Sequence, residues 1–234
     1  NYHNATTMSK AAKDKEEKNT YVIVTNIAPT TERLLANESA LTEIRLLGFG
    51  ITLEDVQNLS YALTENKVLQ HLSLDHLSMG DDAAEQLSQG ICYNSSLLTL
   101  SMRWNKLGDK GGHAIANSLH YNQTLKELVL SFNELGDKSA KSFALAMKRN
   151  NSLETLDLKW NKIGDQCGDL LLDSMADNRT LVNLYLGGNG SALRNVGRAR
   201  ATRNQSTAKR FLSTIGIGGN TSSQKSTQTI TLGT

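Results

Sequence analysis

The strongest constraint on this chain is a leucine pattern that recurs every 28 residues. Each block opens with Leu-x-x-[Leu/Ile]-x-[Leu/Met], and a partial sixth block runs from Leu181 to about Asn189. The five full blocks begin at Leu41, Leu69, Leu97, Leu125 and Leu153. A fixed period of this length indicates a stack of similar units, each burying its apolar face against its neighbours. The sequence therefore predicts a repeat domain over residues 41–190 that acts through its surface rather than through a single pocket.

Within one block the pattern changes from that of a strand to that of a helix. Around Leu128 and Leu130, apolar and polar residues alternate as in a short strand with one buried face. Phe143 and Met147 then recur at the spacing of one helix face. An Asn follows four of the strands, at Asn105 and its equivalents, and we expect its amide to bond the backbone of neighbouring turns. Each unit is thus predicted to be a strand, a turn and a helix.

Two further columns mark the predicted helix ends. A Gly-Asp pair precedes four helices, and we expect the Asp to be the N-cap of the helix that follows it. These aspartates are Asp81, Asp109, Asp137 and Asp165. An Asn closes each helix, where we expect the left-handed conformation that often ends helices. These asparagines are Asn66, Asn94, Asn122, Asn150 and Asn178.

Four members of the asparagine column also match the acceptor pattern for N-glycosylation. They are Asn94, Asn122, Asn150 and Asn178, each two residues before a Ser or Thr. Residues 1–20 lack the apolar stretch of a secretory signal and are predicted to be disordered. We therefore interpret the column as a helix-end feature rather than as a set of glycan sites.

The composition is that of a globular protein, with 38% hydrophobic and 21% charged residues among 234. No apolar run approaches the roughly 18 residues that span a bilayer, so no membrane partner is predicted. Cys92 and Cys167 occupy different block positions and form no C-x-x-C motif. We interpret them as reduced core residues, which favours a cytoplasmic location.

The blocks at residues 97–124 and 153–180, LLTLSMRWNKLGDKGGHAIANSLHYNQT and LETLDLKWNKIGDQCGDLLLDSMADNRT, resemble the ribonuclease-inhibitor type of leucine-rich repeat. The resemblance covers residues 41–189. It implies an α/β solenoid, a right-handed horseshoe with a concave parallel sheet and convex helices. Proteins of this type include the sensor regions of NOD-like receptors and the Ran GTPase-activating protein, which recognise other proteins. The atypical segment 21–40 is predicted to be an irregular N-terminal cap, since terminal repeats cover the open end of a core.

Candidate partner-binding residues lie at the outward strand positions and just after them. Both tryptophans of the chain fall at position 8 of their blocks, with Phe132 between them. Trp and Arg are the residue types that most often dominate interface energies. The candidates are Trp104, Phe132, Trp160, Arg103, Lys159, Asp75, Asp157 and Tyr185. Two interpretations stay open for the aromatic residues, recognition of a partner or packing against the next turn.

His71, Asp75 and His76 are close in sequence and are of metal-ligating types. On one strand face, His71 and Asp75 are about 13 Å apart at roughly 3.3 Å per residue. A single ion with bonds near 2 Å cannot bridge that distance, so no metal and no cofactor is predicted.

The last segment, residues 191–234, has seven basic residues and no acidic one, whereas residues 1–190 have a net charge of −5. It is rich in Ser, Thr, Gly and Asn and is predicted to be a disordered basic tail. Its basic residues show no nucleic-acid-binding signature, and no nucleic acid is predicted as a partner. Lys225, Thr227, Gln228 and Thr229 are similar to the Lys-x-Thr-Gln-Thr motif bound by the dynein light chain, a recognition by strand addition. A chance match in a Ser/Thr-rich segment is the alternative.

The sequence contains no nucleophile elbow, phosphate loop or zinc-protease signature. We therefore predict no enzyme activity, and a non-catalytic intracellular module for protein–protein interaction, an adaptor, scaffold or sensor region. The alternative is a regulator of a small GTPase that resembles the Ran GTPase-activating protein. That family has an acidic C-terminal tail, whereas this tail is basic. Ribonuclease inhibition is less favoured, since the ribonuclease inhibitor is much longer and rich in Cys.

Overall fold

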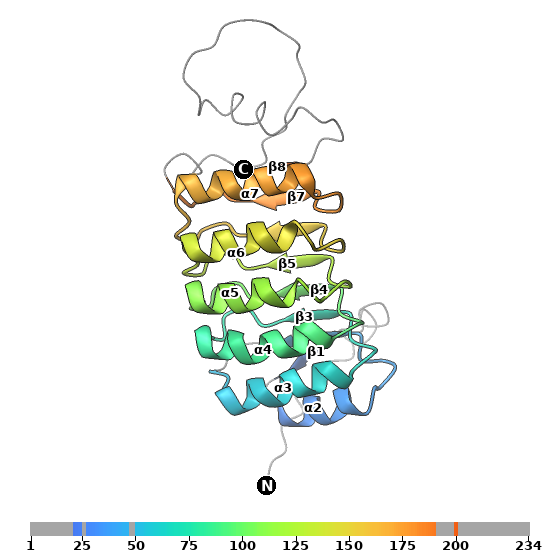
Figure 1. Ribbon diagram of the computed structural model, residues 1–234. Coiled ribbons are helices and arrows are strands. Elements are labelled where there is room, and N and C mark those ends of the chain that lie inside the picture. The colour runs from blue at the N-terminus through green and yellow to red at the C-terminus, as the bar shows by residue number, and fades with distance from the viewer. Residues whose placement is uncertain (1–20, 25–26, 47–49, 191–198, 201–234) are drawn as a thin grey trace, which may run out of the picture.

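The computed structural model describes residues 21–24, 27–46, 50–190 and 199–200. It shows two layers, a sheet and a row of parallel helices that cover one of its faces (Figure 1). The strands are β1 (Tyr21–Val24), β2 (Glu43–Leu46), β3 (His71–Ser73), β4 (Thr99–Ser101), β5 (Glu127–Val129), β6 (Thr155–Asp157), β7 (Asn183–Tyr185) and β8 (Ala199–Arg200). The helices are α2 (Ala28–Leu35), α3 (Leu53–Glu65), α4 (Asp81–Tyr93), α5 (Asp109–Ser118), α6 (Asp137–Met147) and α7 (Asp165–Asp177).

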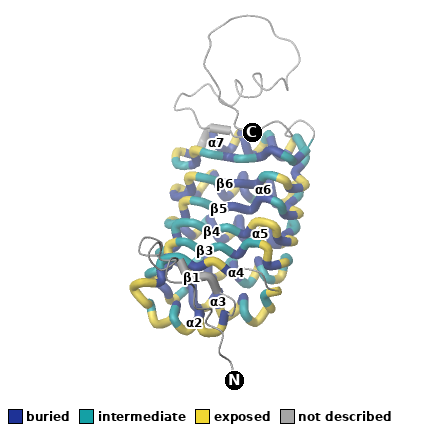
Figure 2. The backbone as a smooth tube through the Cα atoms, turned by 180° about the vertical axis from the view of Figure 1, so that it is seen from behind, coloured by how far each residue is buried: buried dark blue, intermediate teal, exposed yellow. Residues whose placement is uncertain are grey.

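The strands follow one another in sequence order, and β1 to β7 pair in parallel. The register advances by one repeat at each step, so that Leu72 pairs with Leu100 and Leu100 with Leu128. Side chains at these positions point toward the helices and are 2% exposed or less. The predicted α/β leucine-rich repeat solenoid is confirmed. The face of the sheet that points away from the helices carries the alternate strand residues and is not covered by any described helix (Figure 2).

The Asn at position 9 bonds neighbouring turns as expected. The Asn105 amide nitrogen donates to the carbonyl of Leu74, one repeat earlier, and to that of Met102 in its own repeat. Its Oδ1 accepts the N–H groups of Leu77 and Met79. These bonds satisfy backbone groups in the turn, where the sheet ladder has ended.

The aspartates at the helix starts do not cap their own helices, and that prediction was wrong. The N-cap residues are the preceding glycines, without a side-chain cap bond. Each carboxylate instead reaches the next repeat. Asp81 accepts the N–H groups of Gly108 (2.6 Å) and Gly111 (2.9 Å), and Asp109 accepts those of Gly136 and Ser139, both at 2.9 Å. An aspartate of one unit thus satisfies the free N–H groups at the start of the following helix.

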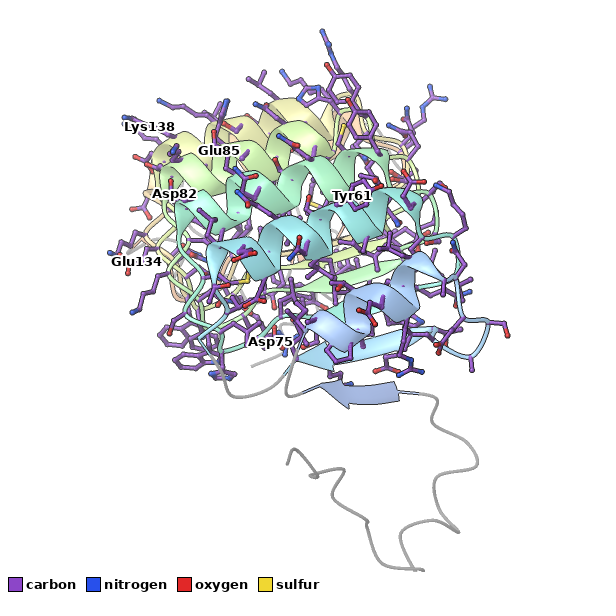
Figure 3. The ribbon with its side chains drawn as sticks, turned by 90° about the horizontal axis from the view of Figure 1, so that it is seen from below. Tyr61, Asp75, Asp82, Glu85, Glu134 and Lys138 are labelled. Atoms are coloured by element: carbon purple, nitrogen blue, oxygen red, sulfur yellow. The ribbon has the colours of Figure 1, made fainter. Side chains whose placement is uncertain are left out.

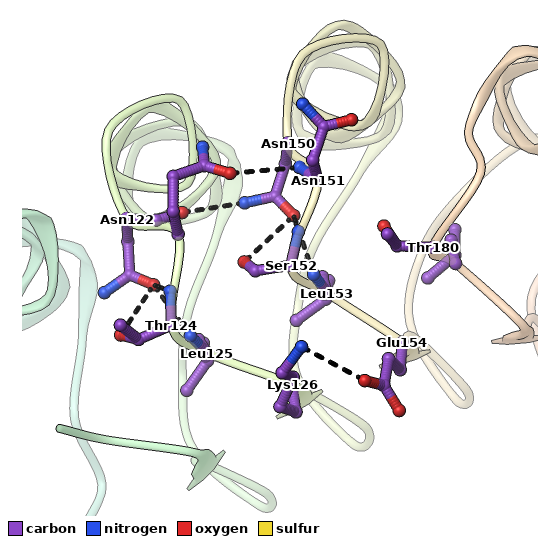
Figure 4. Close-up of polar contacts among 12 residues, drawn as sticks. Asn122, Thr124, Leu125, Lys126, Asn150, Asn151, Ser152, Leu153, Glu154 and Thr180 are labelled. Carbon is purple, nitrogen blue, oxygen red and sulfur yellow. Dashed lines mark hydrogen bonds and ion pairs between the residues drawn. The ribbon is translucent and has the colours of Figure 1, made fainter. Parts of the chain in front are cut away.

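The asparagine column (Asn66, Asn94, Asn122, Asn150 and Asn178) also differs from the expectation. Asn66, Asn94 and Asn178 are extended, with φ of −75°, −69° and −83°, not left-handed. The side chains are buried, 8% exposed at most. The Asn150 amide nitrogen donates to the carbonyls of Leu119 and Asn122 in the preceding repeat, both at 2.8 Å, as Figure 4 shows for Asn122.

The Asn150 Oδ1 completes this arrangement within its own repeat. It accepts the N–H groups of Ser152 (3.0 Å) and Leu153 (2.8 Å), so the amide links two successive units (Figure 4). In the folded array the amide nitrogens are therefore buried and bonded, which agrees with a structural rather than a glycan-bearing column.

At the ends of the array, β1 pairs with β2, and β8 adds an antiparallel edge strand to β7. The sequence did not predict β8, which lies within the segment expected to be disordered. The predicted boundaries of the N-terminal cap and of the tail stay predictions. The dynein light-chain motif, Lys225 to Thr229, lies outside the described residues.

Candidate protein-interaction surface

The aromatic column comprises His76, Trp104, Phe132 and Trp160, each at position 8 of its repeat. It lies at the rim where the strands end and the chain turns toward the helices. Figure 3, a view along the array, places Asp75 and Glu134 at this same rim and Tyr61 on the helix layer. Each residue of the column is left-handed, with φ of 61°, 54°, 58° and 53° in chain order.

A left-handed conformation is unfavourable for bulky residues, but backbone hydrogen bonds to the next repeat hold these residues in it. Each N–H of the column donates to a carbonyl of the next repeat. Trp104 donates to Ser131 (3.2 Å), Phe132 to Lys159 (2.9 Å) and Trp160 to Gly187 (2.8 Å). These bonds continue the parallel ladder beyond the strands, and they position the four side chains one above another.

The four rings are stacked. Ring centroids are 5.6 Å apart for His76 and Trp104, 3.9 Å for Trp104 and Phe132, and 5.7 Å for Phe132 and Trp160. Interplanar angles are 12° or less. At the last ring a Cβ on Gly188 would lie 2.5 Å from the Trp160 indole, so only glycine fits there. Each face of Trp104, Phe132 and Trp160 therefore lies against a neighbouring ring or against the backbone of Gly188.

Despite this stacking, much of the column is accessible. Trp104 is 51% exposed and Trp160 is 56% exposed. The stacking contacts agree with the interpretation that these residues pack against the next turn. The exposed surface of the tryptophans is what recognition of a partner requires. The assignment of these residues to partner binding stays a prediction.

Two of the candidate acids hold the turn around the column. Asp75 Oδ1 accepts the Ser101 hydroxyl (2.6 Å) and the backbone N–H of Arg103 (2.7 Å). Asp157 is only 6% exposed, and its Oδ1 accepts the N–H of Lys159 at 3.0 Å. Burial leaves Asp157 little surface to offer a partner, so its contacts are those of a positioning residue.

The remaining candidates lie beside the column. The Lys159 ammonium is 3.8 Å from the Asp157 carboxylate and 5.1 Å from the centre of the Tyr185 ring. Arg103 is exposed. Sequence reasoning missed Lys106 and Lys162, which lie at position 10 on the helix side of the rim and are also exposed. The signal that could have found them is their common distance of two residues from a tryptophan.

The histidines take part in polar contacts between repeats. His71 Nδ1 lies 2.8 Å from the Thr99 hydroxyl, across β3 and β4. His113 on α5 has its Nδ1 2.8 Å from the hydroxyl of Ser142 on α6, and its Nε2 2.9 Å from the Asn117 amide nitrogen in its own helix. Over the residues with assigned positions, no three His, Cys, Asp or Glu side chains are grouped as a metal site requires.

Comparison with known proteins supports the fold. A family model described as Leucine Rich repeat matches residues 93–116, 121–144 and 149–168. No curated protein matches the chain. Within the positioned part of the chain, none of the helices has the length and apolar character of a membrane span.

Two solved structures show the same architecture. The first is that of leiomodin-1 actin-binding site 2, with a TM-score of 0.53 and 24% identity, covering 65% of this chain and 91% of that one. The second is the tropomodulin C-terminal domain of Caenorhabditis elegans, with a TM-score of 0.56 and 19% identity, covering 66% of this chain and 93% of that one. At these identities the likeness shows the fold alone.

Proposed function

Because this chain is a leucine-rich repeat solenoid, we propose that it is a non-catalytic module that binds a partner protein through the aromatic column. The observation that supports this most is a regular array of stacked rings that stay half exposed, whereas the inward strand leucines beside them, such as Leu100 and Leu128, are buried. Exposed Trp side chains beside basic residues are typical of the residues that dominate interface energies.

Other features support a binding module rather than a catalyst. The two thiols are free, and burial raises the pKa of Cys167, with a further contribution from the Asp137 carboxylate. A raised thiol pKa keeps Cys167 protonated and a poor nucleophile at neutral pH. Free thiols also fit the proposed reducing, cytoplasmic compartment.

The experiment compares capture of partners by four forms of the full chain, wild type, Trp104→Ala, Trp160→Ala and Tyr121→Ala. Tyr121 is 75% exposed and lies beyond the end of α5, away from the column, so it is the matched aromatic control. We expect a protein that is recovered with wild type and the Tyr121 variant and lost with both Trp variants. Recovery that is equal for all four folded forms would contradict the proposal.

Two more specific functions need their own tests. Actin is a reasonable probe in the capture because the similar leiomodin-1 structure is that of an actin-binding site. Regulation of a small GTPase and binding of the dynein light chain by Lys225 to Thr229 stay predictions. A GTP hydrolysis assay tests the first, and titration of a peptide of residues 225–232 tests the second.

A further inference from the structure

The surroundings of the aromatic column are basic, although the repeat body is acidic. On the two sides of the column, positions 7 and 10 carry four basic and two acidic side chains. They are Arg103, Lys106, Lys159 and Lys162 against Asp75 and Glu134. Residues 1–190 as a whole have a net charge of −5. The net charge of the positions that flank the aromatic column is therefore positive, whereas that of residues 1–190 is negative.

Pairing within the surface neutralises only part of this charge. Glu134 and Lys162 form an ion pair at 2.7 Å, and Lys159 lies 3.8 Å from Asp157. The Arg103 guanidinium and the Lys106 ammonium, by contrast, make no ion pair or hydrogen bond with any residue that the structure places. Arg103 and Lys106 thus border Trp104 on both sides. Neither forms an ion pair with a described residue, although the Lys106 charge adds to the larger effect of Lys162 in lowering the pKa of Glu134.

The exposed parts of the rings favour the same kind of ligand. The edge of an aromatic ring carries partial positive charge, and the indole Nε1–H is a hydrogen-bond donor with no acceptor function. In the placed part of the chain, neither the Trp104 nor the Trp160 Nε1 has a hydrogen-bond partner. Ring edges, indole N–H groups and cations all attract oxygen acceptors.

The covered ring faces disfavour a different class of ligand. Proteins that bind single-stranded nucleic acids do so by stacking bases on exposed aromatic faces. Here the faces of Trp104 are covered by His76 and Phe132, and those of Trp160 by Phe132 and Gly188. These neighbours compete with a base for the indole faces, which disfavours stacking.

We propose that the occupant of the aromatic column is an acidic, extended segment of a partner protein. This rests on the proposed function, that the column is the contact surface. The four rings span about 15 Å from the first centroid to the last. About five residues of extended chain cover that length at roughly 3.3 Å per residue. Carboxylates of the segment bind Arg103 and Lys106 and accept the indole N–H groups, and its apolar side chains lie against the ring edges.

The test uses the full chain and fluorescently labelled ten-residue probes, followed by anisotropy. One peptide alternates Glu with Leu, a second carries Gln in place of every Glu, and a third probe is a ten-nucleotide oligothymidine. We expect the acidic peptide to bind at least tenfold more tightly than the Gln peptide, with an affinity that falls as salt is raised. Oligothymidine should bind more weakly than the acidic peptide.

Variants then locate the site. Arg103→Gln and Lys106→Gln should each weaken the acidic peptide by about fivefold, the effect of losing one charged contact of roughly 1 kcal/mol. Lys141→Gln, on α6 and away from the column, removes the same charge and should have no effect. Equal binding of the acidic and Gln peptides, equal effects of all three variants, or tighter binding of oligothymidine would overturn the inference.

The two proposals fail in distinguishable ways. Suppose that a captured partner is lost with Trp104→Ala but is unaffected by Arg103→Gln and Lys106→Gln. The proposal of an acidic segment is then wrong, and the column remains the contact surface. If Trp104→Ala changes neither capture nor peptide binding, the column itself is not the contact surface, and both proposals fall together.

Discussion

The aromatic column and the asparagine column are both repeated from unit to unit, yet they differ in burial and in hydrogen bonding. The asparagines are at most 8% exposed, and the amide of Asn150 is hydrogen-bonded at both its nitrogen and its oxygen. The two tryptophans are half exposed, and their indole N–H groups have no partner among the described residues. Periodicity alone therefore does not separate a packing column from a candidate recognition column, whereas burial and hydrogen-bond completeness do.

The difference has a cause in the backbone of each unit. At the helix end the chain has left its hydrogen-bonding ladder, and a buried side-chain amide replaces the missing partners. At the strand end the backbone is still bonded to the next repeat, through N–H groups such as that of Phe132. The side chain there is not needed for backbone bonding, which leaves its edge available to a partner.

The largest expected effect comes from removing one member of the asparagine column. Asn150→Ala leaves the carbonyls of Leu119 and Asn122 and the N–H of Leu153 without their partner. We expect it to lower the free energy of unfolding by about 3 kcal/mol, since each buried unsatisfied group costs about 1–3 kcal/mol. Urea unfolding measures this, while partner affinity per folded molecule should stay unchanged.

The neighbouring Asn151 supplies the control. It is exposed, and Asn151→Ala should change the free energy of unfolding by less than about 0.5 kcal/mol. Equal losses at Asn150 and Asn151 would show that the buried amide bonds do not stabilise the array.

The aspartates that cap the next helix extend the comparison to a charged group. Burial alone would raise the pKa of Asp109, but hydrogen bonds from the Ser139 N–H and hydroxyl and from the Gly136 N–H outweigh burial and lower it. We expect Asp109→Ala to cost about 2 kcal/mol. Asp137 is exposed and accepts the Gly164 N–H, so Asp137→Ala should lower the free energy of unfolding by less.

The lowered pKa of Asp109 gives this prediction a pH dependence. The stabilisation is present above the carboxyl pKa of the unfolded chain, about 3.9, and is lost as the pH falls through the lower folded value. The difference between wild type and Asp109→Ala in urea unfolding should therefore shrink below about pH 4. A difference that grows on acidification would contradict this assignment.

A smaller effect separates ring stacking from backbone strain within the aromatic column. Trp104→Ala loses the stacking contacts and keeps the left-handed backbone at φ 54°, whereas Trp104→Gly loses the contacts and relieves the strain. We expect the Gly variant to be more stable than the Ala variant by about 1 kcal/mol. Thermal melting measures this, and an Ala variant that melts higher than the Gly variant would show that no strain is stored at Trp104.

The smallest effect is expected at α7, where hydrogen bonding is incomplete. Asp169 Oδ1 is buried without a partner in the part of the structure that is described. Burial, with smaller contributions from Asp173 and Asp165, raises its pKa, so its ionised form costs stability above the unfolded value near 3.9. Asp169→Asn should raise the melting temperature at pH 7, because the free energy of unfolding should increase by roughly 0.5–1 kcal/mol. The gain should vanish in acid, and a loss at pH 7 would contradict it.

Most of the fold could be predicted because the leucine spacing gives both the length of the repeat unit and the register between neighbouring strands. Leu72, Leu100 and Leu128 fall on one line in the sequence pattern and on one line in the sheet. The pattern also placed Trp104, Phe132 and Trp160 in a single column, and the structure stacks them.

What sequence reasoning missed depends on contacts between units. A Gly-Asp pair at a helix start reads locally as an N-cap, but the N–H groups that Asp109 accepts belong to the next repeat, thirty residues away for Ser139. The extended conformation of Asn94 likewise follows from the buried partners of its amide, which no local preference reveals. The short strand β8 has no repeat motif, and it pairs with β7 at the end of the sheet.

Tryptophan fluorescence is the most direct test of the central claim, since both tryptophans of the chain lie in the aromatic column. The partner recovered in the capture is titrated into the full chain, and Trp emission and its quenching by iodide are followed. A blue shift and protection from iodide that saturate with the binding curve are expected as the half-exposed indoles become covered. Saturable binding that leaves both the emission maximum and the quenching unchanged would contradict the account.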